Sequence, residues 1–308
     1  MQIIHKIAQL RESVATSKKE GLRIGLVPTM GALHEGHLEL IRNAHNSCDV
    51  VVVSIFVNPT QFGPNEDLEK YPRTLESDAK MCENEHVDII FAPSVAEMYP
   101  DQNYLQIQVH KLADTLCGAT RPGHFNGVLQ VVNKFFQIVQ PDEAFFGQKD
   151  IQQFVLIQTM VNEFNIPVEL HAIPTVRNSD GLALSSRNRY LSASDREIAP
   201  NFYAHLREVK SELELILNED VGQPEDSNVE FNRDQNRYTS THQRLQEKIQ
   251  FHKDKLTEIG FKIDYLEVVD FKTLQPVQLP TDVDKFIIAG AVYIGNTRLI
   301  DNIIVENN

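Results

Sequence analysis

Cysteine is scarce in this 308-residue sequence, and tryptophan is absent. The three cysteines lie far apart and form no CxxC pair, which argues against a disulfide framework or a zinc site and favours a reducing compartment. No run approaches the ~20 apolar residues that a membrane span needs. Residues 1–10 also lack the apolar core of a signal peptide. We therefore expect a cytoplasmic protein without a membrane partner.

Basic residues are also fewer than acidic ones. Lysine and arginine total 29 against 43 aspartates and glutamates, a formal net charge of -14. This balance argues against non-specific binding of nucleic acid or of anionic membranes, although a local basic pocket is compatible with it. The sequence contains no GxxxxGK[ST] and no GxGxxG after a strand. The first absence excludes a P-loop NTPase, and the second disfavours dinucleotide binding.

Alternating apolar runs and helical patterns predict the fold class. Strands are expected at residues 24–27, 50–57, 87–91, 144–146 and 168–172, with helices at 38–46, 75–84, 127–139 and 152–164. This order predicts an α/β protein whose N-terminal domain, residues 1–174, is a Rossmann-like doubly wound parallel sheet. Residues 175–308 predict a smaller α+β domain with strands at 262–269, 285–292 and 298–305. Within it, the acidic stretch 218–241 is expected to be a mobile surface insertion.

The strongest chemical signal is an HxGH pattern, His34-Glu-Gly-His37, between the first buried strand and a helix. A helix N-terminus at the carboxyl end of a parallel strand favours an anion, and open α/β sheets bind ligands there. Gly36 would let a phosphate approach the backbone closely. The two histidines could instead be structural or bind a metal, but no third ligand with suitable spacing is evident.

Other polar segments also follow predicted strands. Gln61, in Asn-Pro-Thr-Gln-Phe, offers donor and acceptor atoms suited to hydroxyl groups, although without further context a strand-ending turn is the better explanation. Lys149, in Gly-Gln-Lys-Asp, is a flexible cation suited to a triphosphate, and the neighbouring Asp150 could cap a helix. Arg187 follows two serines on a late polar loop and could grip phosphate oxygens. Arg121 could contact an anion or stabilise a domain junction.

In order along the chain, these motifs resemble the pantoate–β-alanine ligase family, within the HxGH nucleotidyltransferase-like superfamily. The resemblance rests on residues 27–37, 56–62, 121–125, 146–150 with Gln152 and Gln153, 184–188 and 297–302. It implies ATP-dependent condensation of pantoate with β-alanine through a pantoyl-adenylate, releasing pyrophosphate and then AMP. The stretch 218–241 looks longer than is usual for the family.

The resemblance also implies the site residues. His37, His34 and Lys149 would be catalytic, with His37 as proton donor, and Gln61 and Gln153 would bind pantoate and β-alanine. The implied ATP-binding residues are Met30, Gly31, Ala32, Leu33, His34, Glu35, Gly36, His37, Gly147, Gln148, Lys149, Asp150, Val176, Leu184, Ser185, Ser186 and Arg187. Mg²⁺ would arrive with ATP, with no protein ligand assigned and no prosthetic group. The second domain would act as a lid, and a homodimer is the usual assembly of the family.

Three alternatives stay open on the sequence. One is an HxGH enzyme that leaves the nucleotidyl group on a phosphorylated acceptor. A second is a non-catalytic nucleotide-binding module, which would be expected to have lost the histidines or Lys149, although all of them are present. A third is an acidic interaction protein that acts through residues 218–241.

Overall fold

The computed structural model describes residues 1–64, 66–101, 104–221, 230–277 and 283–307; for 219–221 and 230–241 it describes the backbone alone. The chain folds as two compact units. The first contains Met1–Val176 and Leu184–Ser186, and the second contains Arg177–Ala183 and Arg187–Asn308. A single domain from residue 175 onward would keep residues 184–187 together, whereas here Leu184–Ser186 belong to the first unit and Arg187 belongs to the second.

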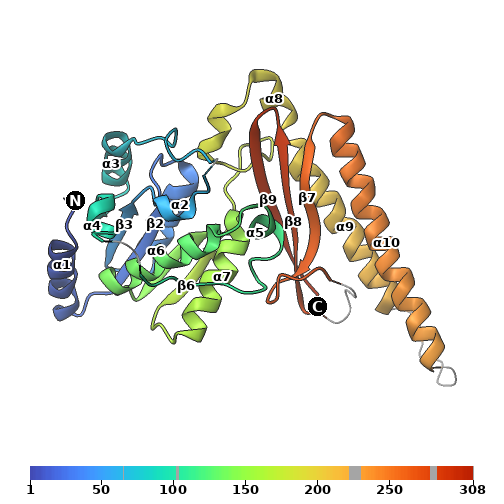
Figure 1. The fold of residues 1–308 in the computed structure, drawn as a ribbon, viewed down its shortest axis with the longest axis horizontal. Coiled ribbons are helices and arrows are strands. Elements are labelled where there is room, and N and C mark those ends of the chain that lie inside the picture. The colour runs from blue at the N-terminus through green and yellow to red at the C-terminus, as the bar shows by residue number, and fades with distance from the viewer. Residues whose placement is uncertain (65, 102–103, 222–229, 278–282, 308) are drawn as a thin grey trace. The chain divides into compact units, whose positions relative to one another are not determined.

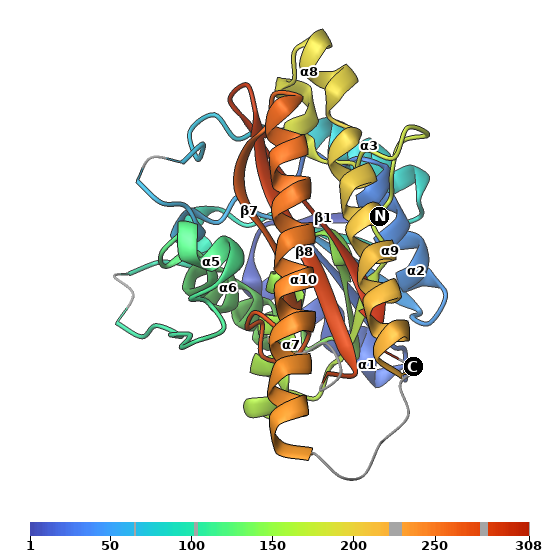
Figure 2. The same ribbon diagram turned by 90° about the vertical axis from the view of Figure 1, so that its right-hand side faces the viewer.

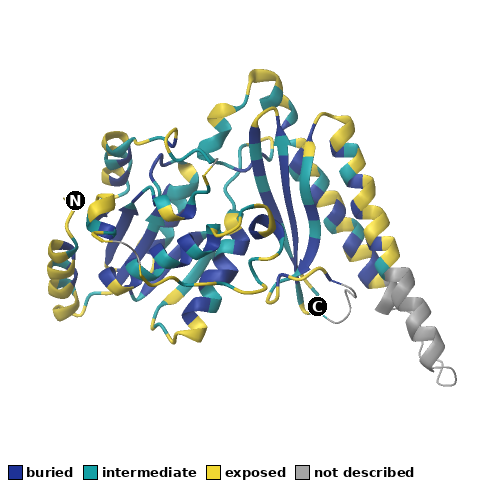
Figure 3. Ribbon diagram, viewed as in Figure 1, coloured by how far each residue is buried: buried dark blue, intermediate teal, exposed yellow. Residues whose placement is uncertain are grey.

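A six-stranded parallel sheet forms the centre of the first unit (Figure 1). Its spatial order is β1-β4-β3-β2-β5-β6. The strands are β1 (Gln2–Ile4), β2 (Ile24–Thr29), β3 (Val50–Ile55), β4 (Ile89–Phe91), β5 (Glu143–Gly147) and β6 (Glu169–Ile173). The central strands β2 and β3 are almost wholly buried (Figure 3), in keeping with their mainly apolar sequences. The predicted Rossmann-like parallel sheet is thus confirmed.

Helices cover both faces of this sheet. On one face, α2 (Glu35–His45) and α3 (Leu75–Asn84) share a core with β2, β3 and β4 that includes Ile41, Val51, Cys82 and Ile90. On the other lie α1 (Ile7–Lys19), α6 (His124–Val139) and α7 (Ile151–Glu163). The helix after β2, α2, therefore lies on one face of the sheet, and the helix after β5, α7, lies on the other. Because β2 and β5 are neighbours, a topological switch point lies at their carboxyl ends.

The second unit is built on a three-stranded antiparallel sheet, ordered β7-β8-β9. It consists of β7 (Lys262–Asp270), β8 (Lys285–Ile294) and β9 (Thr297–Glu306). Two long helices, α9 (Asn201–Val221) and α10 (Glu230–Glu258), run side by side against it (Figure 2). Their apolar faces bury Phe202, Leu206 and Leu256 with strand residues such as Ile288. The predicted α+β character of this part is confirmed.

Shorter elements complete the described chain: α4 (Val95–Met98), α5 (Leu116–Thr120), α8 (Ala193–Ile198) and the 3-10 turns η1 (Pro59–Gln61), η2 (Gln148–Asp150) and η3 (Ser186–Tyr190). The core of the expected insertion, residues 222–229, lies outside the described residues. On either side of it the backbone is helical, to Val221 and from Glu230. None of the helices in the described part of the chain combines the length and apolar character that crossing a bilayer requires.

Candidate active site

Three of the predicted motifs follow three neighbouring parallel strands. Residues 30–37 follow β2, residues 58–62 follow β3, and η2 follows β5. Since β2 lies between β3 and β5, these turns share one edge of the sheet, beside the switch point. The fold thus gathers HxGH, Gln61 and Lys149 at one end of the first unit.

The turn from β2 into α2 is held by a buried carboxylate that lies outside every predicted motif. Gly31 and Ala32 have left-handed backbones, with φ of 80° and 51°. The Asp78 side chain, 1% exposed on α3, accepts hydrogen bonds from the backbone N–H groups of Ala32 (3.0 Å) and Leu33 (2.9 Å). The Thr74 hydroxyl also donates to it, at 3.1 Å. A β-carbon on Gly31 would lie 3.0 Å from Asp78 Oδ2, so this turn and this carboxylate fit each other closely.

The two histidines cap α2 reciprocally. His34 is the N-cap, and its Nδ1 accepts from the Gly36 N–H at 3.2 Å. His37 Nδ1 accepts from the His34 N–H at 3.3 Å. The ring centroids are 4.1 Å apart. Because each Nδ1 accepts a backbone hydrogen bond, each neutral ring carries its proton on Nε2. A β-carbon on Gly36 would lie 3.0 Å from the His34 ring, which gives this glycine a structural reason beside the predicted phosphate approach.

Burial keeps His37 uncharged. It lowers the pKa of His37 to about 3, with further lowering by the nearby charges of His34 and Lys149. Lys149 is 19% exposed in its side chain and lies 3.8 Å from Asp150 Oδ2. At neutral pH this end of the sheet therefore presents a lysine cation beside the neutral imidazole of His37, a combination suited to an anion that needs hydrogen-bond donors.

Gln61 is buried and in contact with the HxGH turn. Its Nε2 lies 3.0 Å from Met30 Sδ, and its Oε1 accepts from Asn58 Nδ2 at 3.2 Å. Asn58 is 1% exposed, donates to the Gly127 carbonyl at 3.1 Å and accepts from the Tyr99 hydroxyl at 2.9 Å. The roles of Asn58 and Tyr99 were missed. Asn58 directly after a strand was a usable signal, whereas Tyr99 lies 41 residues away from it.

Arg121 contacts Glu66 and His124 within the first unit, and its predicted contact with an anion stays a prediction. Its guanidinium makes a paired contact with Glu66 at 2.6 Å for both bonds and lies 2.9 Å from His124 Nε2. His124 Nδ1 in turn lies 2.8 Å from the Gln61 carbonyl oxygen. Burial, assisted by the Arg121 charge, lowers the pKa of His124 to about 4. His124 thus holds the backbone of the Gln61 turn, and Arg121 holds His124 in place.

The two adjacent glutamines at the start of α7 have different surroundings. Gln152 is buried, donates to the Leu112 and Thr115 carbonyls at 2.9 Å each, and accepts from the Gly118 N–H at 3.3 Å. Gln153 is half-buried. Gln152 therefore fixes the segment before α6, while Gln153 retains amide surface for a ligand.

The late loop begins within the first unit. The Leu184 N–H donates to the Val176 carbonyl at 3.0 Å, and Ser185 and Ser186 are half-buried there. Arg187 belongs to the second unit. The intervening hairpin 177–183 is fixed by Arg177, which makes a bidentate pair with buried Asp301 of β9 at 2.5 and 2.8 Å. The motif 297–302 therefore anchors the hairpin that leads into Leu184.

Two groups of side chains in the described residues could hold a metal ion: His205 with Glu208 and His252, and Glu143 with Glu169 and His171. Neither group includes His34 or His37. The predicted ATP-site residues thus supply hydrogen-bond donors and two cations, Lys149 and Arg187, and none of them belongs to either candidate metal group.

Comparison with known proteins gives one consistent result. The model of the pantoate-beta-alanine ligase family matches residues 2–304. Pantothenate synthetases from Alcanivorax borkumensis and Moorella thermoacetica are each 46% identical, covering 98% and 100% of this chain and 97% and 100% of their own lengths. The crystal structure of pantothenate synthetase from Thermus thermophilus superposes with a TM-score of 0.79 at 38% identity, covering 98% of this chain and 99% of that one.

A second solved structure is a ligand complex. Pantoate-beta-alanine ligase from Francisella tularensis, complexed with beta-gamma ATP and beta-alanine, is 37% identical with a TM-score of 0.75, over 99% of this chain and 97% of that one. Every relative named here carries one of the two names of the same ligase. Together with the motifs at the switch point, these matches show that the chain belongs to the pantoate–β-alanine ligase family, enzymes that form an amide bond.

Proposed function

We propose that this chain condenses pantoate with β-alanine at the expense of ATP, through a pantoyl-adenylate. The observation that carries the proposal is the position of three motif turns after β5, β2 and β3, with Gln61 in contact with Met30 of the HxGH turn. The relative from Francisella tularensis, with its ATP and β-alanine ligands, supports the same substrates.

In the first half-reaction, a carboxylate oxygen of pantoate attacks the α-phosphorus of ATP. An oxygen–phosphorus bond forms, the bond from the α-phosphorus to the bridging oxygen breaks, and pyrophosphate leaves. In the second, the amine of β-alanine attacks the activated carbonyl carbon, loses a proton and expels AMP. No enzyme nucleophile is required, so catalysis consists of positioning the reactants and stabilising charge.

The residues divide this work by charge and position. His34 and His37 carry their protons on Nε2 and would donate hydrogen bonds to phosphate oxygens without adding a second cation beside Lys149. Lys149 would stabilise charge on the phosphates. Gln61 and Gln153 would orient pantoate through its hydroxyl and carboxylate oxygens. The remaining predicted residues of the β2–α2 turn, of η2 and of the 184–187 loop would complete the ATP site.

The metal and the assembly are part of the same proposal. Mg²⁺ would enter bound to phosphate oxygens and water, where it neutralises phosphate charge. The residues present fit this arrangement, because Lys149 and Arg187 suit phosphate oxygens and, among the described residues, neither candidate group of metal ligands includes a predicted ATP-site residue. We also infer a homodimer in the cytoplasm, to be checked by light scattering of the purified protein.

The lid role of the second unit is proposed on the family resemblance. Energy transfer between dyes on exposed Arg11 and Leu215, measured with and without ATP, tests it. An unchanged transfer efficiency on saturation with ATP would contradict lid closure.

The reaction is tested by mixing the purified chain with ATP, Mg²⁺, pantoate and β-alanine, and by omitting each in turn. We expect equal amounts of pantothenate and AMP, and multiple turnovers only when both organic substrates are present. Continuous release of pyrophosphate without β-alanine, with the nucleotidyl group kept on an acceptor, would instead favour the transferase alternative.

A further inference from the structure

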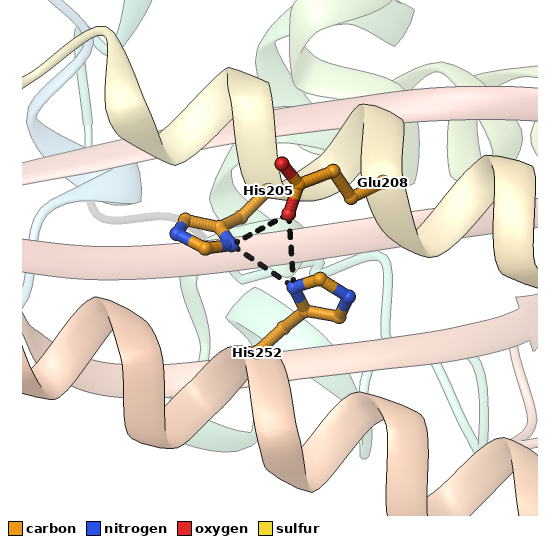
Figure 4. A group of neighbouring side chains, drawn as sticks. All are labelled: His205, Glu208 and His252. Carbon is orange, nitrogen blue, oxygen red and sulfur yellow. Dashed lines mark hydrogen bonds and ion pairs between the residues drawn. The ribbon is translucent and has the colours of Figure 1, made fainter.

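A cluster of metal-ligating side chains lies in the second unit, between the two long helices. His205 and Glu208, one turn apart on α9, face His252 on α10 (Figure 4). The two histidine Nδ1 atoms are 2.9 Å apart, and Glu208 Oε2 lies 3.3 Å from His205 Nδ1 and 3.5 Å from His252 Nδ1. Three electron-rich atoms thus converge on one point, and the ligase reaction uses none of them.

The spacing of these atoms matches that of ligands around a first-row transition metal. Three points with these separations lie on a circle of radius about 1.9 Å, slightly less than the ~2.0–2.2 Å of zinc–nitrogen and zinc–oxygen bonds. An ion would therefore sit just off the plane of the three atoms with little movement of the side chains. Glu208 is 61% exposed in its side chain, so water can reach the fourth position.

Glu212 fixes the ring of His252 in the form that a metal needs. His252 is 2% exposed in its side chain, and its Nε2 lies 3.1 Å from Glu212 Oε2. A carboxylate only accepts, so Nε2 carries a proton and, in the neutral ring, Nδ1 presents a lone pair toward His205 and Glu208. A carboxylate behind a coordinating histidine is a common supporting arrangement at zinc sites. Lys248 neutralises Glu212 from its other side at 3.0 Å.

In the second group of potential metal ligands, a carboxylate is already paired with an arginine. Glu143, with Glu169 and His171, already forms an ion pair with the guanidinium of Arg23 and accepts from the Ser47 hydroxyl at 2.6 Å. An arginine cation thus already neutralises Glu143, the buried carboxylate of this group. Among the described residues, Glu208 forms no such pair with a lysine or arginine, and its ion-pair partners are His205 and His252. The α9–α10 cluster is therefore the better candidate.

We propose that His205, Glu208 and His252 form a binding site for a divalent transition-metal ion of the zinc class, with water as the fourth ligand. The ion would link α9 to α10. Such a bridge stabilises the packing of the two helices, because a metal that binds only the folded chain raises its stability. None of these three residues is among the predicted ATP-binding residues.

Calorimetric titration of the EDTA-treated full chain with Zn²⁺ tests the proposal. We expect one high-affinity ion per chain, a raised melting temperature, and the visible absorption of tetrahedral coordination when Co²⁺ replaces Zn²⁺. His205→Ala and Glu208→Gln should each weaken Zn²⁺ binding at least ~10-fold, and Glu212→Gln should weaken it ~10–100-fold through the His252 ring. Since His252 is buried, these variants avoid altering it directly.

His242→Ala is the matched control, because it removes a histidine from the same helix α10 without touching the cluster. Its Zn²⁺ affinity should equal that of the unmodified chain. The proposal is overturned if the full chain takes up no high-affinity Zn²⁺. It is equally overturned if all variants bind Zn²⁺ as the unmodified chain does, which would indicate adventitious surface binding.

Discussion

Asp78 gives the sharpest test of how this fold positions its chemistry. The carboxylate lies outside every recognised motif, yet it accepts the backbone N–H groups of Ala32 and Leu33 directly before the two HxGH histidines. Asp78→Asn keeps the size of the side chain but replaces one acceptor oxygen with an amide donor. One of the two backbone N–H groups must then lose its partner inside the protein.

The magnitude follows from these bonds. A hydrogen bond to a charged group contributes ~1.5–3 kcal/mol to stability, and a buried donor left unsatisfied costs a similar amount. A loss of ~2 kcal/mol should lower the melting temperature of a unit of this size by ~4–8 °C. Displacement of His34 and His37 by ~1 Å should further reduce kcat by ~10²-fold.

Pantothenate formation and thermal unfolding are measured on the same preparations. Asp142→Asn is the matched control: its carboxylate accepts the Ile24 N–H at 2.7 Å, at the amino end of the same strand β2. That variant should lose stability but keep its kcat. Asp78→Asn with the kcat of the unmodified chain would refute the reasoning that this carboxylate positions the HxGH turn.

Other perturbations address individual groups. His37→Ala should lower kcat by ~10²-fold or more with the fold intact by circular dichroism; unchanged kcat would remove it from the transition state. Gln61→Ala should mainly raise the KM for pantoate, and an unchanged KM would reject this contact. The pKa of His37 in the folded chain lies far below its value in the unfolded chain. The stability that the neutral His37 ring contributes to the folded state is therefore fully present above pH ~6.5. That stability is lost as pH falls from ~6.5 toward the folded pKa of about 3. A melting profile for His37→Gln should therefore fall less steeply between pH ~6.5 and ~4 than that of the unmodified chain, and parallel profiles would contradict the lowered pKa.

The parts of the site that are local in sequence could be predicted. Residues 24–27, followed by HxGH and a helical pattern, contain a strand, a turn and a helix start close together along the chain, and the structure has β2, the turn and α2 in that order. The alternation of apolar runs and helices predicted the parallel sheet, because period and run length reflect burial on both faces of such a sheet.

The long-range contacts could not be predicted. Asp78 reaches Ala32 across 46 residues, and Arg121 pairs with Glu66 across 55. Such pairs depend on how α3 and the end of α5 pack against distant segments, which no local pattern encodes. Arg121 shows the consequence: the sequence left contact with an anion and a role at a domain junction both open, and gave no sign of its ion pair with Glu66.

The His205 cluster was missed for a similar reason. His205 and Glu208 are three residues apart and share a helix face, but their partner His252 lies 47 residues beyond His205, after the segment 218–241. Only the side-by-side packing of α9 and α10 brings the three together.

Transfer of labelled oxygen tests the central claim, adenylation of pantoate, most directly. Pantoate labelled with ¹⁸O in its carboxylate is converted by the purified chain with ATP, Mg²⁺ and β-alanine. The ¹⁸O content of each product is then measured by mass spectrometry. Attack on the α-phosphorus predicts one ¹⁸O atom in each AMP and none in pyrophosphate. Unlabelled AMP, or ADP with the label in inorganic phosphate, would contradict the pantoyl-adenylate.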